Sequence, residues 1–557
     1  MIRWRSTSTV TFISSTRSPS RRSRVRELRD GGAAAVASLA AGVETLGAVL
    51  ARTYGPVAGT VLLDSGRALP EVVEDGGLLA RRITGLPDRR GHAGVMALRD
   101  TCLATRRRYG DGAATVAVLA RSMVAQASRL VVAGAHPVSL RRGIERGVTA
   151  ASAALTATAT AVSSDDDLRR LAAGACHDSE VSEVLAELFG LLGERAGLIV
   201  EERSTPGVER GYVDGARWRA KPAFREVVPD GSTDVALRDP EIVVADATLT
   251  AVEDVVPALE HALASRRPLL LVVRGIESAA KAAVLGNRAR STIIPMRLAS
   301  VERQVPDDIA DLALLTGATV LGDVLGRPPR TLRPADCGRA RLVVLTRRHV
   351  TVSGGAGTPA GAEARAGQLL GRAAAIERGS DEWRAARMRI ARLSGAQGVI
   401  VVGGYTAGER QLRADRVAKA QRVLELAARG GAVPGGGVAL LECAEAVRAA
   451  RSGCAGIDEA WGVDLVATAL SAPLRQLVDN YRSRHEAPHP DLALARIADL
   501  GQGWGFDAQQ GEFAPMAKAG VLDAAGVLTG AVEAAGSLTA TLVSSAAVVT
   551  ARRRAAS

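Results

Sequence analysis

Four glycine-associated stretches hold the residues best suited to chemistry in this sequence. They are "TYGP" (53–56), "EDGG" (74–77), "GDGAAT" (110–115) and "VPGGG" (433–437). Glycine lets backbone N–H groups approach a phosphate closely, and the start of a helix adds a favourable dipole. Asp75 and Asp111 offer hard oxygen ligands for a magnesium ion that would neutralise phosphate charge. Together the stretches predict a site for a phosphorylated ligand, although each alone also fits an ordinary turn.

Asp111 has two interpretations, because it lies between two glycines just before the apolar run "AATVAVLA". It holds a cation beside a phosphate, or it is a turn residue that caps the next helix. The chain contains no GxxxxGK[ST] sequence, so the predicted phosphate site is not a P-loop.

Segments of helical and strand-like pattern show which elements must position these residues. Residues 32–148 are mostly helical, apart from the short strand "TVLLD". From 197 to 345 the strand-like runs "GLIVEE", "EIVVAD", "PLLLVV", "STIIPM" and "RLVVLT" alternate with helical segments, which predicts an α/β layer with partly parallel strands. Residues 369–549 are mainly Ala-rich helix. We therefore expect an α/β domain inserted into a helical domain that both chain ends build.

Length and composition indicate a globular protein of several domains. At 557 residues the chain exceeds one hydrophobic core, and 47% hydrophobic with 23% charged residues excludes a disordered protein. No apolar run approaches the length of a membrane span, and we expect no membrane partner. Five cysteines without a CxxC pair predict reduced thiols and a cytoplasmic location.

The net charge of +12 lies mainly in the two ends of the chain. Residues 1–26 carry seven Arg and no acid, and residues 552–554 add three Arg; subtracting these ten charges leaves about +2 for the rest. The body therefore lacks the field of a nucleic-acid-binding protein, and nucleic acid could bind only through the tails. The Arg- and Ser-rich head has the composition of an organellar transit peptide, but a disordered arm or a misplaced start codon is preferred.

A series of segments in the same order resembles GroEL-type (group I) chaperonins. It includes "LARTYGP", "VEDGGLLARRI", "YGDGAATVAVLA", "GAVPGGGVALLECA", "GFDAQQGEF" and "AGVLDAAGV", and it runs from about residue 24 to the C-terminus. The resemblance implies a multidomain α and α/β fold: a helical equatorial ATP-binding domain, a small intermediate hinge domain and an inserted α/β apical domain. The chain is expected to be a divergent paralogue.

The resemblance also implies the domain boundaries. Residues 1–23 form a basic extension that is expected to be disordered. The other domains are equatorial (24–157 and 430–557), intermediate (158–205 and 398–429) and apical (206–397).

ATP and Mg²⁺ are the cofactors that the resemblance implies, with K⁺ as an open addition. Asp111 matches the aspartate that holds the magnesium ion, Asp75 matches an acid near the terminal phosphate, and Asp523 matches the residue that bonds the ribose. The implied nucleotide-binding positions are Thr53, Tyr54, Gly55, Pro56, Glu74, Asp111, Gly112, Ala113, Ala114, Thr115, Gly436, Asp507, Ala508 and Asp523.

Several positions depart from the family pattern. Ala113 and Ala114 replace two threonines, and Glu74 stands where lysine is usual, so that its carboxylate would repel phosphate. Lys419 replaces the carboxylate that helps to activate water, and a protonated lysine cannot act as a base. Asp415, one helical turn earlier, is a weak substitute, or it simply forms an i,i+4 ion pair with Lys419. We expect ATP binding with slow or absent hydrolysis.

Clients are expected to be unfolded or misfolded proteins. The matched apolar positions are Tyr212, Val256, Leu259 and Leu285, although these residues would also fit the domain's own core. Trp218 is expected to compensate, as a neighbouring apolar contact, for matched positions that are no longer apolar. The resemblance further implies a single or double heptameric ring and a co-chaperonin lid. The alternative is a non-hydrolysing holdase or a nucleic-acid-binding paralogue.

Overall fold

The computed structural model describes residues 25–57, 59, 61–64, 71–85, 91–162, 164–193, 196–224, 226 and 234–552. The predictions for residues 1–24 and 553–557 lie outside this part of the chain. Two compact units divide the chain: the helical unit (1–186 and 415–557) and the sheet unit (187–414). The helical unit is thus discontinuous in sequence, and the finer three-domain division stays a prediction.

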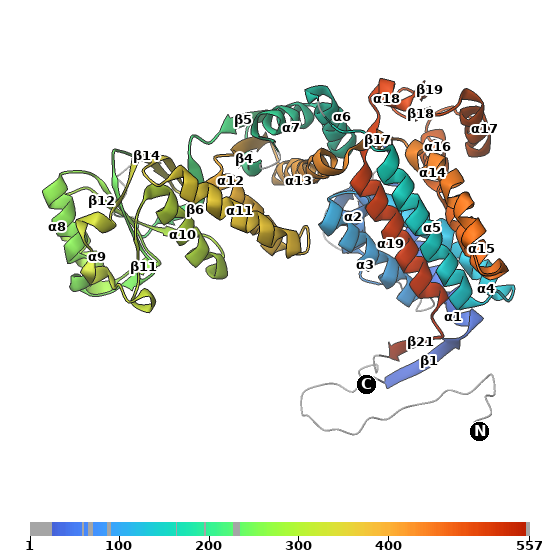
Figure 1. Ribbon diagram of the computed structural model, residues 1–557, viewed down its shortest axis with the longest axis horizontal. Helices are drawn as coiled ribbons and strands as arrows, with labels where there is room; N and C mark the ends of the chain where they lie inside the picture. Colours follow the sequence, from blue (N-terminus) through green and yellow to red (C-terminus); the bar gives the residue numbers. More distant parts are fainter. Residues whose placement is uncertain are drawn as a thin grey trace. The chain divides into compact units, whose positions relative to one another are not determined.

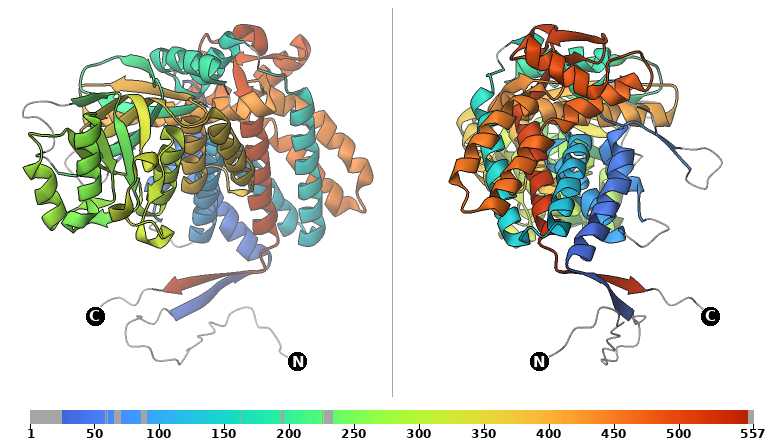
Figure 2. Two further views of the ribbon diagram at one scale, coloured as in Figure 1. Left: turned by 60° about the vertical axis from the view of Figure 1, so that its left-hand side comes forward. Right: turned by 90° about the vertical axis from the view of Figure 1, so that its right-hand side faces the viewer.

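Long helices form the centre of the helical unit, where α1 (Ala33–Ala51), α4 (Ala113–Val132), α5 (Pro137–Thr158) and α19 (Ala525–Val543) lie side by side (Figures 1 and 2). Their buried faces are mainly Ala, Val and Leu. Small side chains let helix backbones approach closely, which compensates for an aromatic content of only 3%. The other helices of this unit are α2 (Gly76–Arg82), α3 (His92–Tyr109), α6 (Asp165–Cys176), α14 (Val438–Ala449), α15 (Ile457–Ala469), α16 (Ala472–Arg482), α17 (Pro490–Leu500) and α18 (Met516–Ala519).

Three of these helices correct an expectation from the sequence. By length and composition alone, α1, α4 and α19 are each apolar enough to cross a membrane, so the prediction that no apolar run has this length is wrong. The reason is that alanine-rich helices keep a high mean hydropathy over their full length. In the structure α4 packs against both α1 and α19, so each helix covers part of another.

Short strand pairs complete the helical unit. They are β2 (Val61–Leu63) with β3 (Glu71–Val73), β17 (Ala432–Pro434) with β20 (Leu522–Ala524), and β18 (Trp504–Asp507) with β19 (Glu512–Pro515). The two ends of the chain also pair, because β1 (Val25–Gly31) runs antiparallel to β21 (Ala547–Arg552). The expectation of helix up to residue 549 is therefore wrong: α19 ends at Val543, and the β-branched residues after it find their partner strand more than 500 residues earlier in the sequence.

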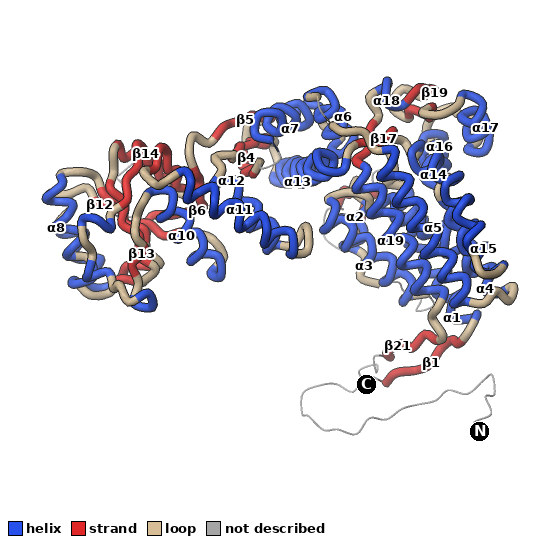
Figure 3. Tube along the Cα trace, in the orientation of Figure 1, coloured by secondary structure: helices blue, strands red, loops and turns tan. Residues whose placement is uncertain are grey.

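An eight-stranded sheet forms the core of the sheet unit, with strand order β13-β8-β10-β12-β6-β15-β14-β7 (red in Figure 3). Strands β13, β8, β10 and β12 are parallel neighbours and the remaining pairs are antiparallel, which confirms the expected partly parallel layer. The strands are β6 (Ala216–Pro222), β7 (Asp234–Arg238), β8 (Glu241–Ala245), β10 (Leu269–Val272), β12 (Ile293–Leu298), β13 (Val320–Leu321), β14 (Gly338–Thr346) and β15 (His349–Gly355).

Helices and smaller sheets accompany this core. In a separate three-stranded sheet, β16 (Gln397–Gly403) lies between β4 (Gly197–Arg203) and β5 (Val208–Tyr212), and β9 (Thr248–Leu249) pairs with β11 (Gly275–Ile276). The helices are α8 (Val256–Ser265), α9 (Ser278–Gly286), α10 (Val305–Thr316), α11 (Pro359–Ala375) and α12 (Asp381–Leu393). Two further helices, α7 (Ser179–Leu192) and α13 (Ala407–Gly430), run from one unit into the other.

Candidate functional site

The turn that carries Asp111 connects α3 to α4. Gly110 ends α3 with φ 79°, and Gly112 precedes α4 with φ 88°; both values lie in the region that favours glycine. One carboxylate oxygen of Asp111 accepts the N–H of Gly112 at 2.7 Å, and no side chain caps α4. The helix-capping interpretation of Asp111 is therefore wrong, and its carboxylate remains open to a partner outside the turn.

Helix α13 packs directly against this turn. Arg422 on α13 donates from Nε and Nη2 to the carbonyl oxygen of Arg108, at 3.1 and 2.9 Å. A Cβ atom at Gly110 would lie only 2.5 Å from Cβ of Arg422. The close approach of α13 thus requires glycine at position 110 for space as well as for backbone conformation.

Lys419, one turn before Arg422, provides the partner of Asp111. Its Nζ lies 3.1 Å from Oδ1 of Asp111, and the side chains are 18% and 33% exposed. Burial alone would lower the pKa of Lys419, but the charges of Asp111 and Asp75 outweigh it and the pKa is raised. Lys419 is therefore a protonated ammonium at neutral pH. The salt bridge joins Lys419 to the turn, and the two interpretations of Asp415 stay predictions.

The carboxylates before α2 are neutralised in the same way. Asp75 caps α2, accepting the N–H of Leu78 at 2.7 Å, and its Oδ1 lies 3.1 Å from Nε of Arg106. Glu74 forms a 2.8 Å ion pair with Arg416 on α13. The expected repulsion between Glu74 and phosphate is consequently reduced by a neighbouring guanidinium. The stretch "EDGG" begins a short helix at Gly76 rather than forming only a turn.

Residues from the C-terminal half reach the same place. Strand β20 carries Asp523, which pairs with Val433 just before the glycine run. Burial, followed by the charge of Asp111, raises the pKa of Asp523 to about 7. Burial and the charges of Asp523 and Asp111 also raise the pKa of Tyr54. These three predicted nucleotide-binding residues therefore lie within electrostatic reach of one another.

Leu477 on α16 links two of the glycine stretches. A Cβ atom at Gly55 would lie 2.4 Å from Cδ1 of Leu477, and one at Gly436 would lie 3.8 Å from its Cδ2. Gly55 has φ 90°, so this position requires glycine for its conformation too. The stretches "TYGP" and "VPGGG" thus face the same side chain.

Asn480, nearly one turn after Leu477, holds the "TYGP" loop in place. Its Nδ2 donates to the carbonyl oxygens of Ala51 and Tyr54, both at 2.8 Å, and the residue is only 4% exposed. The sequence reasoning missed Leu477, Asn480, Arg106 and Arg416. One feature of the sequence could have indicated Asn480. In "APLRQLVDNYR" its polar amide follows the helical spacing of the apolar residues, and a buried amide needs hydrogen-bond partners.

The first three stretches also contact one another. A Cβ atom at Gly76 would lie 2.8 Å from Oγ1 of Thr53 and 3.4 Å from Cβ of Ala114. Thr53, Ala113 and Thr115 are buried, whereas Pro56 is exposed. A threonine at position 114, as in the family pattern, would be bulkier where it faces Thr53 and Gly76.

Two predicted nucleoside contacts have local roles in the structure. Oδ1 of Asp507 accepts the N–H groups of Gln509 and Gln510, at 2.8 and 3.4 Å, in the turn between β18 and β19. Ala508 is buried in a small apolar cluster that also includes Leu477. The carboxylate of Asp507 is therefore engaged in its own turn. The next residue, Ala508, belongs to the same apolar cluster as Leu477, which contacts Gly55.

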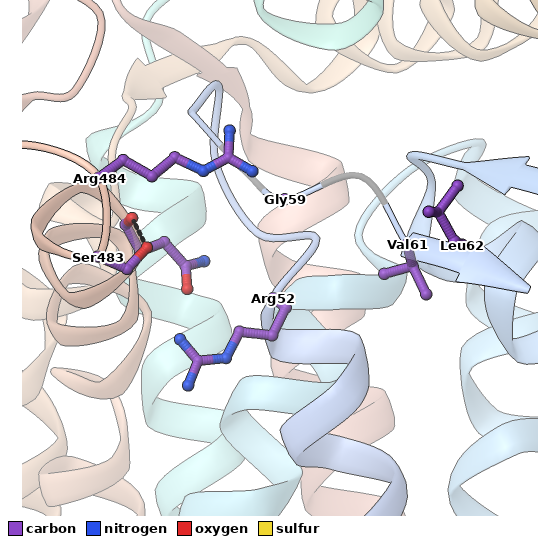
Figure 4. A pocket seen from close by; sticks show the side chains of 7 residues that line it. Arg52, Gly59, Val61, Leu62, Ser483 and Arg484 are labelled. Atoms are coloured by element: carbon purple, nitrogen blue, oxygen red, sulfur yellow. Dashed lines mark hydrogen bonds between the residues drawn. The ribbon is translucent and has the colours of Figure 1, made fainter.

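A pocket of about 420 Å³ lies near the end of α1 and shares Asn480 with the support of the "TYGP" loop (Figure 4). Its lining residues are Arg52, Gly59, Val61, Leu62, Asn480, Ser483 and Arg484. None of the predicted nucleotide-binding residues lines it. Two arginines, Arg52 and Arg484, line the pocket. The guanidinium of Arg52 lies 3.8 Å from the carboxylate of Asp479, so this arginine already faces an acid.

The five apolar positions expected to contact clients lie in the sheet unit and are not equivalent. Trp218 and Leu259 are 1% and 6% exposed in the core of the large sheet, as the own-core alternative expects. Val256 and Leu285 are half-buried on α8 and α9. Tyr212 is 48% exposed, but it belongs to the three-stranded sheet. The structure therefore gathers no continuous client surface from these five residues.

The described side chains around the turn do not supply the set of oxygen ligands that the predicted magnesium ion would need. Among the described residues, no group of three His, Cys, Asp or Glu side chains could hold a metal ion. Asp111 is already neutralised by Lys419, and Asp75 by Arg106. The donor set does not fit a resident divalent cation.

The sequence matches the model of the TCP-1/cpn60 chaperonin family over residues 46–209 and 245–553, which is most of the chain. The matched ranges include the four glycine stretches, Lys419 and Asp523. Residues 210–244, which contain Tyr212 and Trp218, lie outside them.

Proposed function

The chain belongs to the TCP-1/cpn60 chaperonin family, and from this we propose that it is a nucleotide-binding chaperonin whose ATP hydrolysis is slow or absent. Membership implies, in general terms, assistance to protein folding, binding of non-native proteins and assembly into oligomeric rings. Beyond these general properties, we propose that the chain binds a nucleotide, hydrolyses it slowly or not at all, and changes conformation when the nucleotide binds.

The convergence of residues from both halves of the chain carries this proposal. The charge of Asp111 helps to raise the pKa of both Tyr54 and Asp523, and Gly55 and Gly436 face the same leucine. The backbone amides at the start of the 20-residue helix α4, which has no side-chain cap, suit a polyphosphate. A nucleotide extended between the "GDG" turn and the "VPGGG" loop would use all of these groups.

Slow hydrolysis follows from the protonation and contacts of the charged groups. Lys419 is an ammonium without a lone pair, so it cannot take a proton from water. Asp75 is the remaining candidate base, but its carboxylate already accepts the N–H of Leu78 and lies 3.1 Å from Nε of Arg106, so it is not free to accept a proton from water. We therefore expect the protein to bind ATP but to lack most of the general-base catalysis that hydrolysis needs.

Nucleotide-driven movement would start at α13. This helix carries Lys419 and Arg416 within the helical unit, and its first residues belong to the sheet unit. A phosphate that draws on Lys419 would change the balance of contacts that α13 makes with the "GDG" turn. We infer that nucleotide shifts the population of α13 positions by its differential affinity for them.

Calorimetric titration with ATP, beside a phosphate-release assay on the same preparation, tests the proposal. We expect saturable binding and little turnover. Lys419→Ala should weaken binding about tenfold or more, because it removes a charged phosphate donor. Lys518→Ala, at an exposed lysine on α18, is the matched control and should bind as the wild type does. Absence of ATP binding, or turnover like that of an ordinary bacterial chaperonin, would contradict the proposal.

A non-hydrolysing holdase is the second candidate, favoured by the presence of Lys419 in place of a carboxylate. It would suppress aggregation of a denatured client equally well with and without ATP, whereas the leading proposal requires an effect of nucleotide. DNA binding through the Arg-rich tails stays a prediction, since it concerns residues outside the described part of the chain. The heptameric ring, the co-chaperonin lid and the cytoplasmic location also stay predictions.

A further inference from the structure

The salt bridge between Lys419 and Asp111 lies where a nucleotide-bound divalent cation would have to bind. Nζ of Lys419 is 3.1 Å from Oδ1 of Asp111. Magnesium binds carboxylate oxygens at about 2.0–2.1 Å and demands near-octahedral geometry. The ammonium therefore competes directly for the oxygen that such an ion would use, and its positive charge repels a divalent cation at close range.

The fixed position of Lys419 makes this competition effective. Its helix is anchored on the same turn by Arg422, which donates twice to the carbonyl oxygen of Arg108. The lysine side chain is only 18% exposed, so it has little access to solvent. Withdrawal of the ammonium would leave the Asp111 carboxylate beside Asp523, whose pKa is already raised by burial and by the charge of Asp111.

The other acids around the turn offer no alternative metal site. Asp75 is engaged by Leu78 and Arg106, and Glu74 by Arg416. Every acid that approaches the predicted phosphate position from α2 or the "GDG" turn thus already has a cationic partner. Three positive side chains, Arg106, Arg416 and Lys419, therefore occupy the carboxylates that a metal ion would need as ligands.

Lysine also has the donors that a phosphate needs. Its ammonium carries three N–H groups, of which the Asp111 contact occupies one. The remaining donors can bind phosphate oxygens, as lysines in other phosphate sites do. The backbone amides at the start of α4 add further donors. In such a site the positive charge that faces the phosphates comes from protein side chains and not from a bound metal ion.

We propose that Lys419 is a built-in counter-ion for the polyphosphate, so that this site binds nucleotide without a divalent cation. The inference rests on the proposed nucleotide binding and adds its cation requirement. It also identifies Lys419 as the residue that determines whether a metal accompanies the ligand.

The test is calorimetric titration of the full-length protein with ATP, once in excess EDTA and once in MgCl₂. For the wild type we expect the two dissociation constants to agree within about threefold, since the required positive charge is part of the chain. Lys419→Asp should bind at least about tenfold more tightly with Mg²⁺ than in EDTA, because two carboxylates then face the phosphate. Lys518→Asp makes the same charge change at an exposed lysine and should behave as the wild type.

The outcomes separate this inference from the proposed function. Binding by the wild type only in MgCl₂ would overturn the inference and leave nucleotide binding intact. Absence of binding in both buffers would overturn nucleotide binding, and the inference with it. The comparison of buffers with wild-type protein needs no variant, so a folding defect of Lys419→Asp would not remove the test.

Discussion

Lys419 on α13 and Asp111 in the turn before α4 form a salt bridge of 3.1 Å across more than 300 residues of sequence. Arg422 also donates two hydrogen bonds to the carbonyl oxygen of Arg108 at the end of α3, so α13 packs against both α3 and the "GDG" turn. Changes at either position should therefore affect the stability of the helical unit as well as its ligand.

Removal of one partner of this salt bridge should destabilise the protein modestly. Lys419→Met leaves the Asp111 carboxylate without its cation, and we expect a loss of about 1–2 kcal/mol, because both side chains keep some solvent contact. In a double-mutant cycle with Asp111→Asn, measured by calorimetric unfolding, the coupling should be about 1 kcal/mol. Strictly additive effects of the two substitutions would show that the salt bridge contributes no net stability.

Restoring a carboxylate at position 419 should increase ATP turnover. Lys419→Asp provides an oxygen base near the predicted terminal phosphate, and general-base catalysis typically contributes about 10²–10⁴-fold. We expect a rise of at least tenfold, roughly the lower part of that range, in steady-state phosphate release at saturating MgATP. The matched control Lys518→Asp should not change the rate. Equal rates for the two variants would mean that Lys419 is not what limits hydrolysis.

Loss of the Asn480 amide should loosen the "TYGP" loop. Asn480→Ala leaves two carbonyl oxygens, those of Ala51 and Tyr54, without their buried donor, and we expect a cost of about 2–3 kcal/mol and weaker ATP binding. Gln126→Ala, a half-buried amide on α4 that bonds only within its own helix turn, should cost less than about 1 kcal/mol. Thermal unfolding and ATP titration of both variants measure the difference.

A methyl group at Gly110 should disrupt the contact between α13 and the turn. Gly110→Ala imposes strain at φ 79° and places Cβ 2.5 Å from Cβ of Arg422, so one of the two elements must shift. Gly134→Ala has comparable backbone strain at φ 102° but meets no atom within 4 Å. We expect Gly110→Ala to be more destabilising by about 1–3 kcal/mol, the usual cost of overpacking. Equal unfolding midpoints would show that the close approach of Arg422 is not required.

Asp523 should make stability fall as the pH rises towards neutrality. Its carboxyl group has a pKa of about 7 in the folded protein against an ordinary value of 3.8. Between these values the folded chain holds a proton that the unfolded chain has lost, so this contribution is complete below about pH 4 and disappears as the pH passes 7.

Asp523→Asn cannot ionise and should remove this decline. Thermal midpoints of both proteins at about pH 5 and about pH 8 measure it, because the difference between wild type and variant cancels the histidines that titrate in the same window. Parallel curves for the two proteins would contradict the raised pKa.

Local pattern was a good guide to several helices and strands. The strand predicted at "EIVVAD" is β8, all of whose residues are buried, and the helix predicted after the "GDG" turn begins at Ala113. Alternation and glycine position depend on neighbours in sequence, so they can be recognised from one chain. The β21 strand could not be recognised, because its partner β1 lies at the other end of the chain.

Charge compensation was the part of the site that the sequence could not reveal. Glu74 alone predicted repulsion of phosphate, but Arg416 neutralises it from more than 340 residues away. From the sequence, Lys419 was interpreted only as the loss of a catalytic base. In the structure it forms a salt bridge with Asp111. Trp218 was expected to replace a lost apolar contact, yet burial on β6 makes it part of the core. Each difference depends on a long-range contact that no local pattern encodes.

Assembly of the helical unit from both chain ends has a consequence during synthesis on the ribosome. Helices α4 and α5 are complete at residue 158, but α19, which packs against both, begins only at Ala525. At typical elongation rates of about 5–20 residues per second, the nascent helices wait roughly 20 to 70 seconds for this partner. Throughout that interval the alanine- and valine-rich faces of α4 and α5 lack this partner, and exposed apolar surface of this kind makes an incomplete chain prone to aggregation.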